Sequence, residues 1–134
     1  MEKILIEKLI KKAVEMLNFS YAPYSNFHVG AALLTSEGEI FTGCNIENAA
    51  YGPTNCAERT AVFKAVSEGK KNFVAIAIAG GKNGKIEDFC PPCGVCRQVL
   101  AEFCKKDFEI ILAKSTDEYK IMTLEQLLPE SFSL

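Results

Sequence analysis

Apolar residues recur at helical spacing at the start of the chain. In the range 2–18 they lie three or four positions apart, with glutamate and lysine on the opposite face: Ile6, Leu9, Ile10, Ala13, Val14 and Leu17. Because acidic and basic residues are balanced there, the pattern favours a helix packed on a sheet over one on a membrane surface. Residues 21–26, Tyr-Ala-Pro-Tyr-Ser-Asn, interrupt the pattern and indicate a loop.

Two strands and a helix are predicted next. Residues 27–34 and 39–44 have strand patterns, and Ser-Glu-Gly at 36–38 favours a tight antiparallel hairpin between them. The spacing then predicts a helix from Cys56 to Glu68, with Thr54 or Asn55 as its N-cap. Residues 73–79 form a continuous apolar run, which is typical of a fully buried parallel strand.

The rest of the chain continues this alternation. We expect a helix from about Gly94 to Cys104, strands at 108–113 and 119–123, and a short helix through Leu128. Residues 114–118 are too few for a parallel crossover, which needs about a dozen residues, so the last two strands should be antiparallel. The expected fold class is α/β: one three-layer α-β-α domain spanning residues 1–134, with a five-stranded mixed sheet and an antiparallel last strand.

Composition narrows the class of protein. The chain has 134 residues and a net charge of -2, and its two arginines each belong to a cysteine motif rather than to a basic patch, so no basic surface for nucleic acid is expected. The first residues carry too many charges for a signal peptide, and no apolar run is long enough to span a membrane. Six cysteines without signs of secretion indicate metal or redox chemistry, and we expect a cytoplasmic protein.

The cysteines fall into two motifs that predict a catalytic zinc site. Cys56-Ala57-Glu58 begins one predicted helix, and Pro-Cys-x-x-Cys at 92–96 begins the next. Three thiolates leave one corner of a zinc tetrahedron open for water, and this pattern is typical of zinc sites that deaminate a nucleobase. Glu58, two residues after Cys56, should lie near the metal without binding it, as a proton shuttle requires. Arg59 is the first candidate for donating a hydrogen bond to a thiolate, and Arg97 is the second.

Other interpretations of these cysteines stay open. Cys-x-x-Cys also occurs as a redox pair, although here it begins the third predicted helix rather than the first. A structural zinc site would need a fourth protein ligand, which Cys90 could supply. Cys44 and Cys104 are expected in the core, and His28 is expected as a packed or surface side chain.

Three segments closely resemble the small, homotetrameric cytidine deaminases with three cysteine ligands. They are 45–51 (Asn-Ile-Glu-Asn-Ala-Ala-Tyr), 56–61 (Cys-Ala-Glu-Arg-Thr-Ala) and 92–98 (Pro-Cys-Gly-Val-Cys-Arg-Gln), and the resemblance continues to the C-terminus. It implies one zinc ion per chain, held by Cys56, Cys93 and Cys96, which activates water against C4 of cytosine. Glu58 would pass protons first to N3 and then to the departing ammonia, which would convert cytidine or deoxycytidine to its uracil counterpart for pyrimidine salvage.

The same resemblance implies the contacts to the nucleoside. Phe27 and the backbone of Ala57 would hold the base. Asn45 and Glu47, on one face of a strand, would hold the ribose. Ala49 and Tyr51 of one neighbouring subunit and Phe132 of another would complete the pocket. Because a carboxylate repels phosphate, Glu47 favours a free nucleoside over a nucleotide or RNA. Two other functions stay open besides cytidine deamination. One is an aminohydrolase acting on a cytosine-containing nucleoside antibiotic, and the other is a non-catalytic module with structural zinc.

Overall fold

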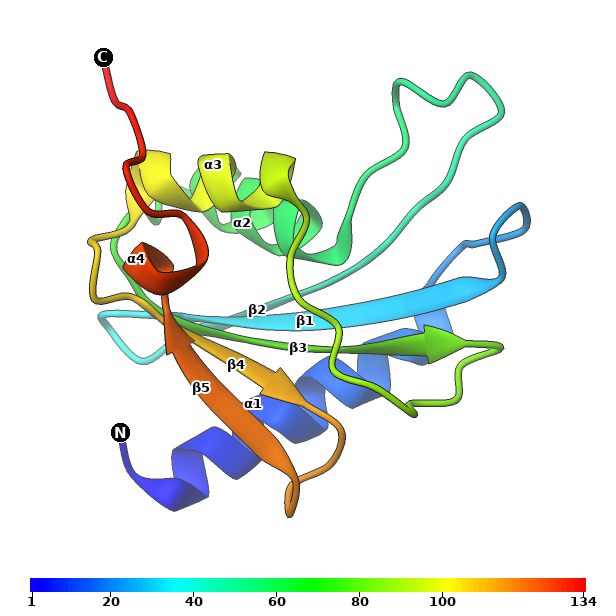
Figure 1. Cartoon of the computed structure of the whole chain (residues 1–134), viewed down its shortest axis with the longest axis horizontal. Coiled ribbons are helices and arrows are strands. Elements are labelled where there is room, and N and C mark those ends of the chain that lie inside the picture. Colours follow the sequence, from blue (N-terminus) through cyan, green and yellow to red (C-terminus); the bar gives the residue numbers. More distant parts are fainter.

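The computed structural model describes all residues from Met1 to Leu134 and centres on one mixed sheet (Figure 1). The sheet has the order β2-β1-β3-β4-β5. Only β3 and β4 pair in parallel, and every other neighbouring pair is antiparallel. The strands are β1 (Phe27–Thr35), β2 (Ile40–Cys44), β3 (Phe73–Lys82), β4 (Glu109–Ala113) and β5 (Tyr119–Thr123). The antiparallel last strand is therefore confirmed.

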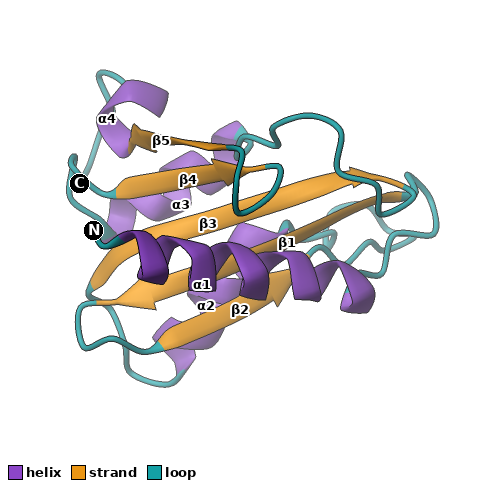
Figure 2. Cartoon of the chain, turned by 90° about the horizontal axis from the view of Figure 1, so that it is seen from below, coloured by secondary structure: helices purple, strands orange, loops and turns teal.

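Helices cover both faces of the sheet, which confirms the expected three-layer α/β fold (Figure 2). Helix α1 (Lys3–Glu15) crosses one face, and α2 (Ala57–Ser67) and α3 (Gly94–Phe103) lie on the other. A 3-10 helix, Met16–Phe19, extends α1, and a short α4 (Leu124–Leu127) follows β5. No helix is long and apolar enough to cross a bilayer.

Alternating residues of β1 supply two separate core clusters. Ala31 and Leu33 face α2 and α3, whereas Ala32 and Leu34 face α1. All four are fully buried or nearly so, and burying a leucine side chain typically contributes about 1.5–3 kcal/mol. The sheet is therefore held on both sides, which fixes the position of the two helices that follow the cysteine motifs.

Helix α2 has a different N-cap from the one predicted. The cap is Cys56, whereas Thr54 and Asn55 are bound elsewhere. Asn55 exchanges two backbone hydrogen bonds of 2.9 Å with Ile46, and the Thr54 hydroxyl accepts from the backbone of Asn48. The pairing of Asn55 with Ile46 keeps the chain extended up to the cysteine.

Two strand predictions are also corrected. Strand β3 continues to Lys82, beyond the predicted end at residue 79, because its whole length pairs with the long β1. It is parallel to β4 but antiparallel to β1, so the prediction of a parallel strand holds on one side only. Strand β2 ends at Cys44, so Asn45 and Glu47 lie in the extended segment beyond it rather than on a strand face.

Candidate functional site

The N-termini of α2 and α3 bring three sulfur atoms together. The helices lie side by side on the same face of the sheet, and each begins directly after a cysteine, Cys56 for α2 and Cys93 for α3. Cys96 lies in the first turn of α3 and is fully buried. The three sulfurs all lie within 4.8 Å of one another, and those of Cys56 and Cys93 are 3.7 Å apart.

The spacing of these sulfurs fits a zinc ion. Two thiolates each about 2.3 Å from zinc in a tetrahedron lie about 3.8 Å apart, close to the separation of Cys56 and Cys93. Cys90 is not a member of the group of three sulfurs, which leaves one corner of a tetrahedron without a cysteine. The donor set therefore fits a catalytic zinc site better than a closed structural one.

Hydrogen-bond donors lie beside the sulfurs of Cys56 and Cys93. Arg59 donates a hydrogen bond from Nη2 to this sulfur at 3.2 Å, and the backbone N–H of Cys96 donates to the Cys93 sulfur at 3.4 Å. Hydrogen bonds from the Cys96 thiol and from Arg59 lower the pKa of Cys56 to about 5. The hydrogen bond to Cys56 is the largest cause that raises the pKa of the Cys96 thiol, and burial is the second. With the two helix N-termini, this environment favours a thiolate at Cys56 rather than at Cys96.

Glu58 lies in the first turn of α2 and is only 4% exposed. Burial and the nearby negative charge of Cys56 raise the pKa of the Glu58 carboxyl to about 7. A carboxyl group with a pKa near neutrality can both accept and donate a proton at physiological pH. Glu58 lines the same cavity as Cys56 and Cys93.

This cavity has a volume of about 260 Å³ and brings most of the predicted site residues together. Its wall combines the metal site with polar groups from the chain segments before β1 and after β2. It is lined by Ser25, Phe27, Val29, Asn45, Glu47, Thr54, Asn55, Cys56, Ala57, Glu58, Cys90, Pro91 and Cys93. A cavity of this kind can hold a small planar ring beside the sulfurs and a polar substituent beside the two side chains that follow β2.

The chain itself fixes the side chains of Glu47 and Asn45. Glu47 accepts hydrogen bonds from the backbone N–H groups of Tyr24 and Ser25, at 2.9 and 3.1 Å, and from the Ser25 hydroxyl. The hydrogen bond from the Ser25 hydroxyl is the main cause that lowers the pKa of Glu47 below its ordinary value. Ser25 was missed in the sequence analysis, because nothing in a Pro-Tyr-Ser-Asn loop indicates a carboxylate partner 22 residues away.

Asn45 makes three hydrogen bonds within the chain. Its Oδ1 accepts from the backbone of Val29 at 2.9 Å and from the hydroxyl of Ser20. Its Nδ2 donates to the carbonyl oxygen of Phe27 at 2.7 Å. Of the two N–H bonds on Nδ2, one is therefore left to point at a ligand, so Asn45 can serve as a donor but not as an acceptor.

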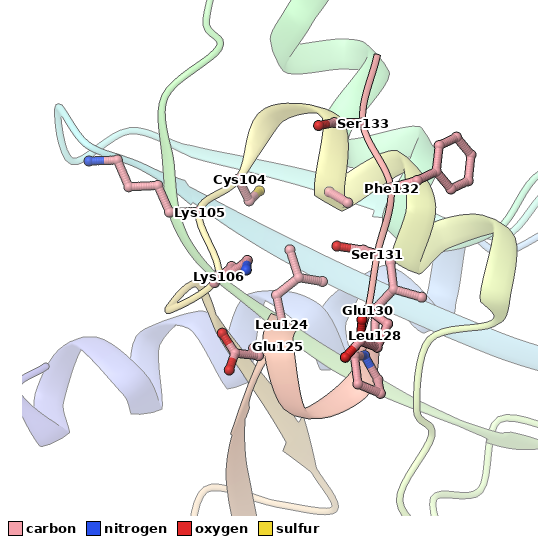
Figure 3. A pocket seen from close by; sticks show the side chains of 12 residues that line it. Cys104, Lys105, Lys106, Leu124, Glu125, Leu128, Glu130, Ser131, Phe132 and Ser133 are labelled. Atoms are coloured by element: carbon pink, nitrogen blue, oxygen red, sulfur yellow. The ribbon is translucent and has the colours of Figure 1, made fainter.

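Three predicted residues lie outside the cavity of their own chain. Ala49 and Tyr51 are exposed in the loop before α2, with Tyr51 78% exposed. Phe132 belongs to the C-terminal tail, which borders a separate hollow of about 540 Å³ between α3 and α4 (Figure 3). In that view the Phe132 ring points away from Leu124 and from the centre of the hollow.

The remaining cysteines and Arg97 have other surroundings. Burial raises the pKa values of Cys90 and Cys104 to about 12, which disfavours their thiolates. Cys44 is buried, as expected of a core residue. Arg97 binds the carbonyl oxygens of Pro92 and Leu127 rather than a sulfur, so its prediction as a thiolate donor is wrong. His28 is half-buried near the start of β1, as a packed or surface side chain would be.

Comparisons with known proteins agree with this geometry. Residues 3–112 match the family model described as the cytidine and deoxycytidylate deaminase zinc-binding region. A cytidine deaminase from Halalkalibacterium halodurans is 47% identical over 95% of this chain and 93% of its own. The crystal structure of a cytidine deaminase from Burkholderia pseudomallei matches with a TM-score of 0.84 and 44% identity, covering 93% of this chain and 97% of that one. A blasticidin-S deaminase from Bacillus cereus is 29% identical over 94% of this chain and 91% of its own.

Proposed function

Since this chain belongs to the zinc-dependent cytidine deaminase family, we propose that it hydrolyses cytidine and deoxycytidine to uridine and deoxyuridine, with release of ammonia. The observation that carries the proposal is the buried Glu58 in one cavity with Cys56 and Cys93, whose sulfurs cluster with that of Cys96. The higher identity to the cytidine deaminase than to the blasticidin-S deaminase supports a nucleoside over an antibiotic as the substrate.

Zinc is the cofactor that the family and the three-cysteine cluster imply, at one ion per chain. Cys56, Cys93 and Cys96 would hold it, and Arg59 would support the Cys56 thiolate through its hydrogen bond. When bound, zinc supplies a Lewis acid that makes a water molecule a better nucleophile near neutral pH. The guanidinium and the helix N-termini would offset the negative charge of three thiolates, which otherwise opposes this effect.

Glu58 is the proposed proton carrier. Its carboxylate would take a proton from the attacking water, deliver it to N3 of the cytosine ring, and later carry a proton to the departing amino nitrogen. A pKa of about 7 suits both directions of transfer. Its burial keeps bulk water away during these transfers, so the proton moves within the cavity.

The other cavity residues are proposed to position the nucleoside. Phe27 would pack on the pyrimidine ring, and the backbone of Ala57 would bind the base. Asn45 would donate its remaining N–H to a ribose hydroxyl, and Glu47 would accept from one. The bonds that Ser25 and Tyr24 make to Glu47 support this role, because they hold its carboxylate in one orientation.

We further propose that the enzyme is a cytoplasmic homotetramer with shared active sites. Ala49 and Tyr51 of one neighbouring subunit and Phe132 of another would cover the open side of the cavity. The exposure of Tyr51 and Phe132, at 78% and 68%, supports this proposal, because large aromatic side chains are commonly buried in oligomer interfaces. Analytical ultracentrifugation tests it: a monomer with full activity would contradict the shared site.

The function is tested by following the loss of cytidine absorbance while measuring zinc on the same sample. Turnover with about one zinc per chain is the expected result. Glu58→Gln should keep zinc and fold but lose activity by at least about 10²-fold, the lower end of the range for positioned proton transfer. Competition between cytidine and a cytosine-containing antibiotic distinguishes the two substrate classes. Zinc without turnover on either would favour a structural-zinc module.

A further inference from the structure

Two asparagines far apart in the sequence adopt the same unusual backbone conformation. Asn26 lies just before β1 with φ of 58°, and Asn83 lies just after β3 with φ of 57°. Few residues other than glycine adopt this left-handed conformation, and asparagine is among those that tolerate it best. Both residues are thus placed at sites where most side chains would be strained.

The two asparagines are bound to each other by two hydrogen bonds. The backbone N–H of Asn83 donates to the carbonyl oxygen of Asn26 at 2.8 Å, and Nδ2 of Asn26 donates to Oδ1 of Asn83. Oδ1 of Asn26 lies 3.3 Å from Nε2 of His28. We call Asn26 and Asn83 the asparagine pair. It joins the loop before β1 to the loop after β3.

The asparagine pair is connected to the cavity through the two chain neighbours of Asn26. Ser25, on one side, donates to the carboxylate of Glu47 from both its backbone and its hydroxyl. Phe27, on the other side, lines the cavity and donates its backbone N–H to the Ser25 hydroxyl at 3.0 Å. Neither Asn26 nor Asn83 lines the cavity itself. The pair therefore acts on the site only through the positions of Ser25 and Phe27.

We propose that Asn26 and Asn83 are positioning residues for nucleoside binding. By fixing the turn at residue 26, the pair holds Ser25 against Glu47 and orients Phe27 toward the cavity. Loss of the bond between the two side chains leaves the metal site unchanged, because no residue of the pair contacts the sulfurs or Glu58. The inference rests on the proposed roles of Glu47 and Phe27, and it predicts an effect on binding of the nucleoside rather than on the chemical step.

The test uses Asn83→Gly, with Asn83→Asp as the conservative variant. Glycine keeps the left-handed backbone and the N–H bond to Asn26 but removes the side-chain acceptor. Aspartate keeps an oxygen at that position and also tolerates this conformation. For the zinc-loaded enzyme, Asn83→Gly should raise KM for cytidine about three- to tenfold, as the loss of one hydrogen bond predicts, with kcat unchanged. In the separate variant Asn83→Asp, KM for cytidine should stay within about twofold of its value in the original chain.

A binding measurement and a second variant complete the test. The Kd of uridine, measured by calorimetry, should rise by the same factor as KM in Asn83→Gly. Asn26→Gly keeps the left-handed backbone but removes the donor side chain, and should raise Kd at least as much. Unchanged KM and Kd in both variants would overturn the proposal, as would a fall in kcat alone.

Glu47→Gln, measured in parallel, separates this inference from the proposed function. If Glu47→Gln weakens uridine binding while both asparagine variants bind normally, the asparagine pair has no positioning role and the role of Glu47 stands. If neither Glu47→Gln nor the asparagine variants weaken binding, the proposed role of Glu47 fails and the inference fails with it. Weaker binding in all three variants is the expected result.

Discussion

The guanidinium group of Arg97 donates a hydrogen bond from Nη1 to the carbonyl oxygen of Leu127 at 2.7 Å. The same side chain donates from Nε to the carbonyl oxygen of Pro92 at 2.8 Å. Pro92 directly precedes Cys93, and Leu127 is the last residue of α4, after which the C-terminal tail begins. One side chain thus fastens the loop that carries a proposed zinc ligand to the end of the chain that carries Phe132.

Arg97→Met should destabilise the fold, because it leaves both carbonyl oxygens without their charged donor. Hydrogen bonds to charged groups contribute about 1.5–3 kcal/mol each, and with partial exposure we expect a loss of about 1–3 kcal/mol in the free energy of unfolding. Urea denaturation of the zinc-loaded protein measures this change in the free energy of unfolding. Arg97→Lys keeps the charge but not the fork of donors, so it should recover only part of the loss. Equal stability of all three proteins would contradict the fastening role.

Arg59→Gln should weaken zinc binding, because it removes the charged donor to the Cys56 sulfur. Loss of a group that supports a metal ligand typically lowers metal affinity about 10- to 100-fold. Competition with a chromogenic chelator measures the affinity. Lys64→Gln is the matched control, since it removes a positive charge from the same helix but its ammonium group donates to the carbonyl of Thr42. An equal loss in both variants would show a general charge effect rather than a specific bond.

Local patterns along the chain predicted most of the fold. Apolar spacing located the helices, and the short connection at residues 114–118 was enough to make β5 antiparallel. The spacing of Cys56, Cys93 and Cys96 predicted a site that two parallel helices do bring together. These inferences succeeded because each depends on periodicity or on connection length, which are properties of neighbouring residues.

Features that depend on pairing between distant segments could not be predicted in the same way. The N-cap of α2 was misplaced because Asn55 pairs with Ile46, a contact that its own neighbours do not indicate. Arg97 was the second candidate for donating to a sulfur because it follows Cys96, but it binds Pro92, in the loop that leads into its own helix, and Leu127 on α4, 30 residues away. The partnership of Ser25 with Glu47 was missed for the same reason.

Ser25→Ala should shift the pH dependence of nucleoside binding toward higher pH. In the original chain the Ser25 hydroxyl lowers the pKa of Glu47 below 4.5, so the carboxylate persists as the pH falls through that value. The contribution of the Glu47 carboxylate to binding is fully present above the ordinary glutamate pKa, and it is lost only as the pH falls through the lowered pKa of the folded protein. Without the hydroxyl the pKa of Glu47 rises, and the carboxylate is protonated at a higher pH.

The Kd of uridine between about pH 4 and pH 7 measures this shift, since the ordinary glutamate pKa lies near the lower end of that range. The variant and the original chain should differ most at the acidic end and least at pH 7, where both carboxylates are ionised. Ser67→Ala is the control, because the Ser67 hydroxyl binds the carbonyl of Lys64. If the Kd of uridine changes with pH in the same way for Ser25→Ala and for the original chain, the Ser25 hydroxyl does not set the pKa of Glu47.

Gly43→Ala should disrupt the placement of α2 on the sheet. Gly43 lies on β2, and a Cβ atom there would come within 2.4 Å of the carbonyl oxygen of Ala57 and 2.5 Å of the backbone nitrogen of Ala61. Both are backbone atoms of α2, so no side-chain rotation relieves the clash and the helix itself must move. Since α2 begins next to Cys56 and carries Glu58, its displacement would move the proposed proton carrier away from the cavity.

We expect Gly43→Ala to lower the free energy of unfolding by about 1–3 kcal/mol, as overpacking typically does, and to reduce zinc content and turnover together. Gly94→Ala is the matched control for stability, because a Cβ there meets no atom within 4 Å and the residue begins α3. Alanine favours a helix over glycine, so that variant should be at least as stable as the original chain. If Gly43→Ala unfolds at the same urea concentration as Gly94→Ala, the close approach of β2 to α2 is not needed to hold the site.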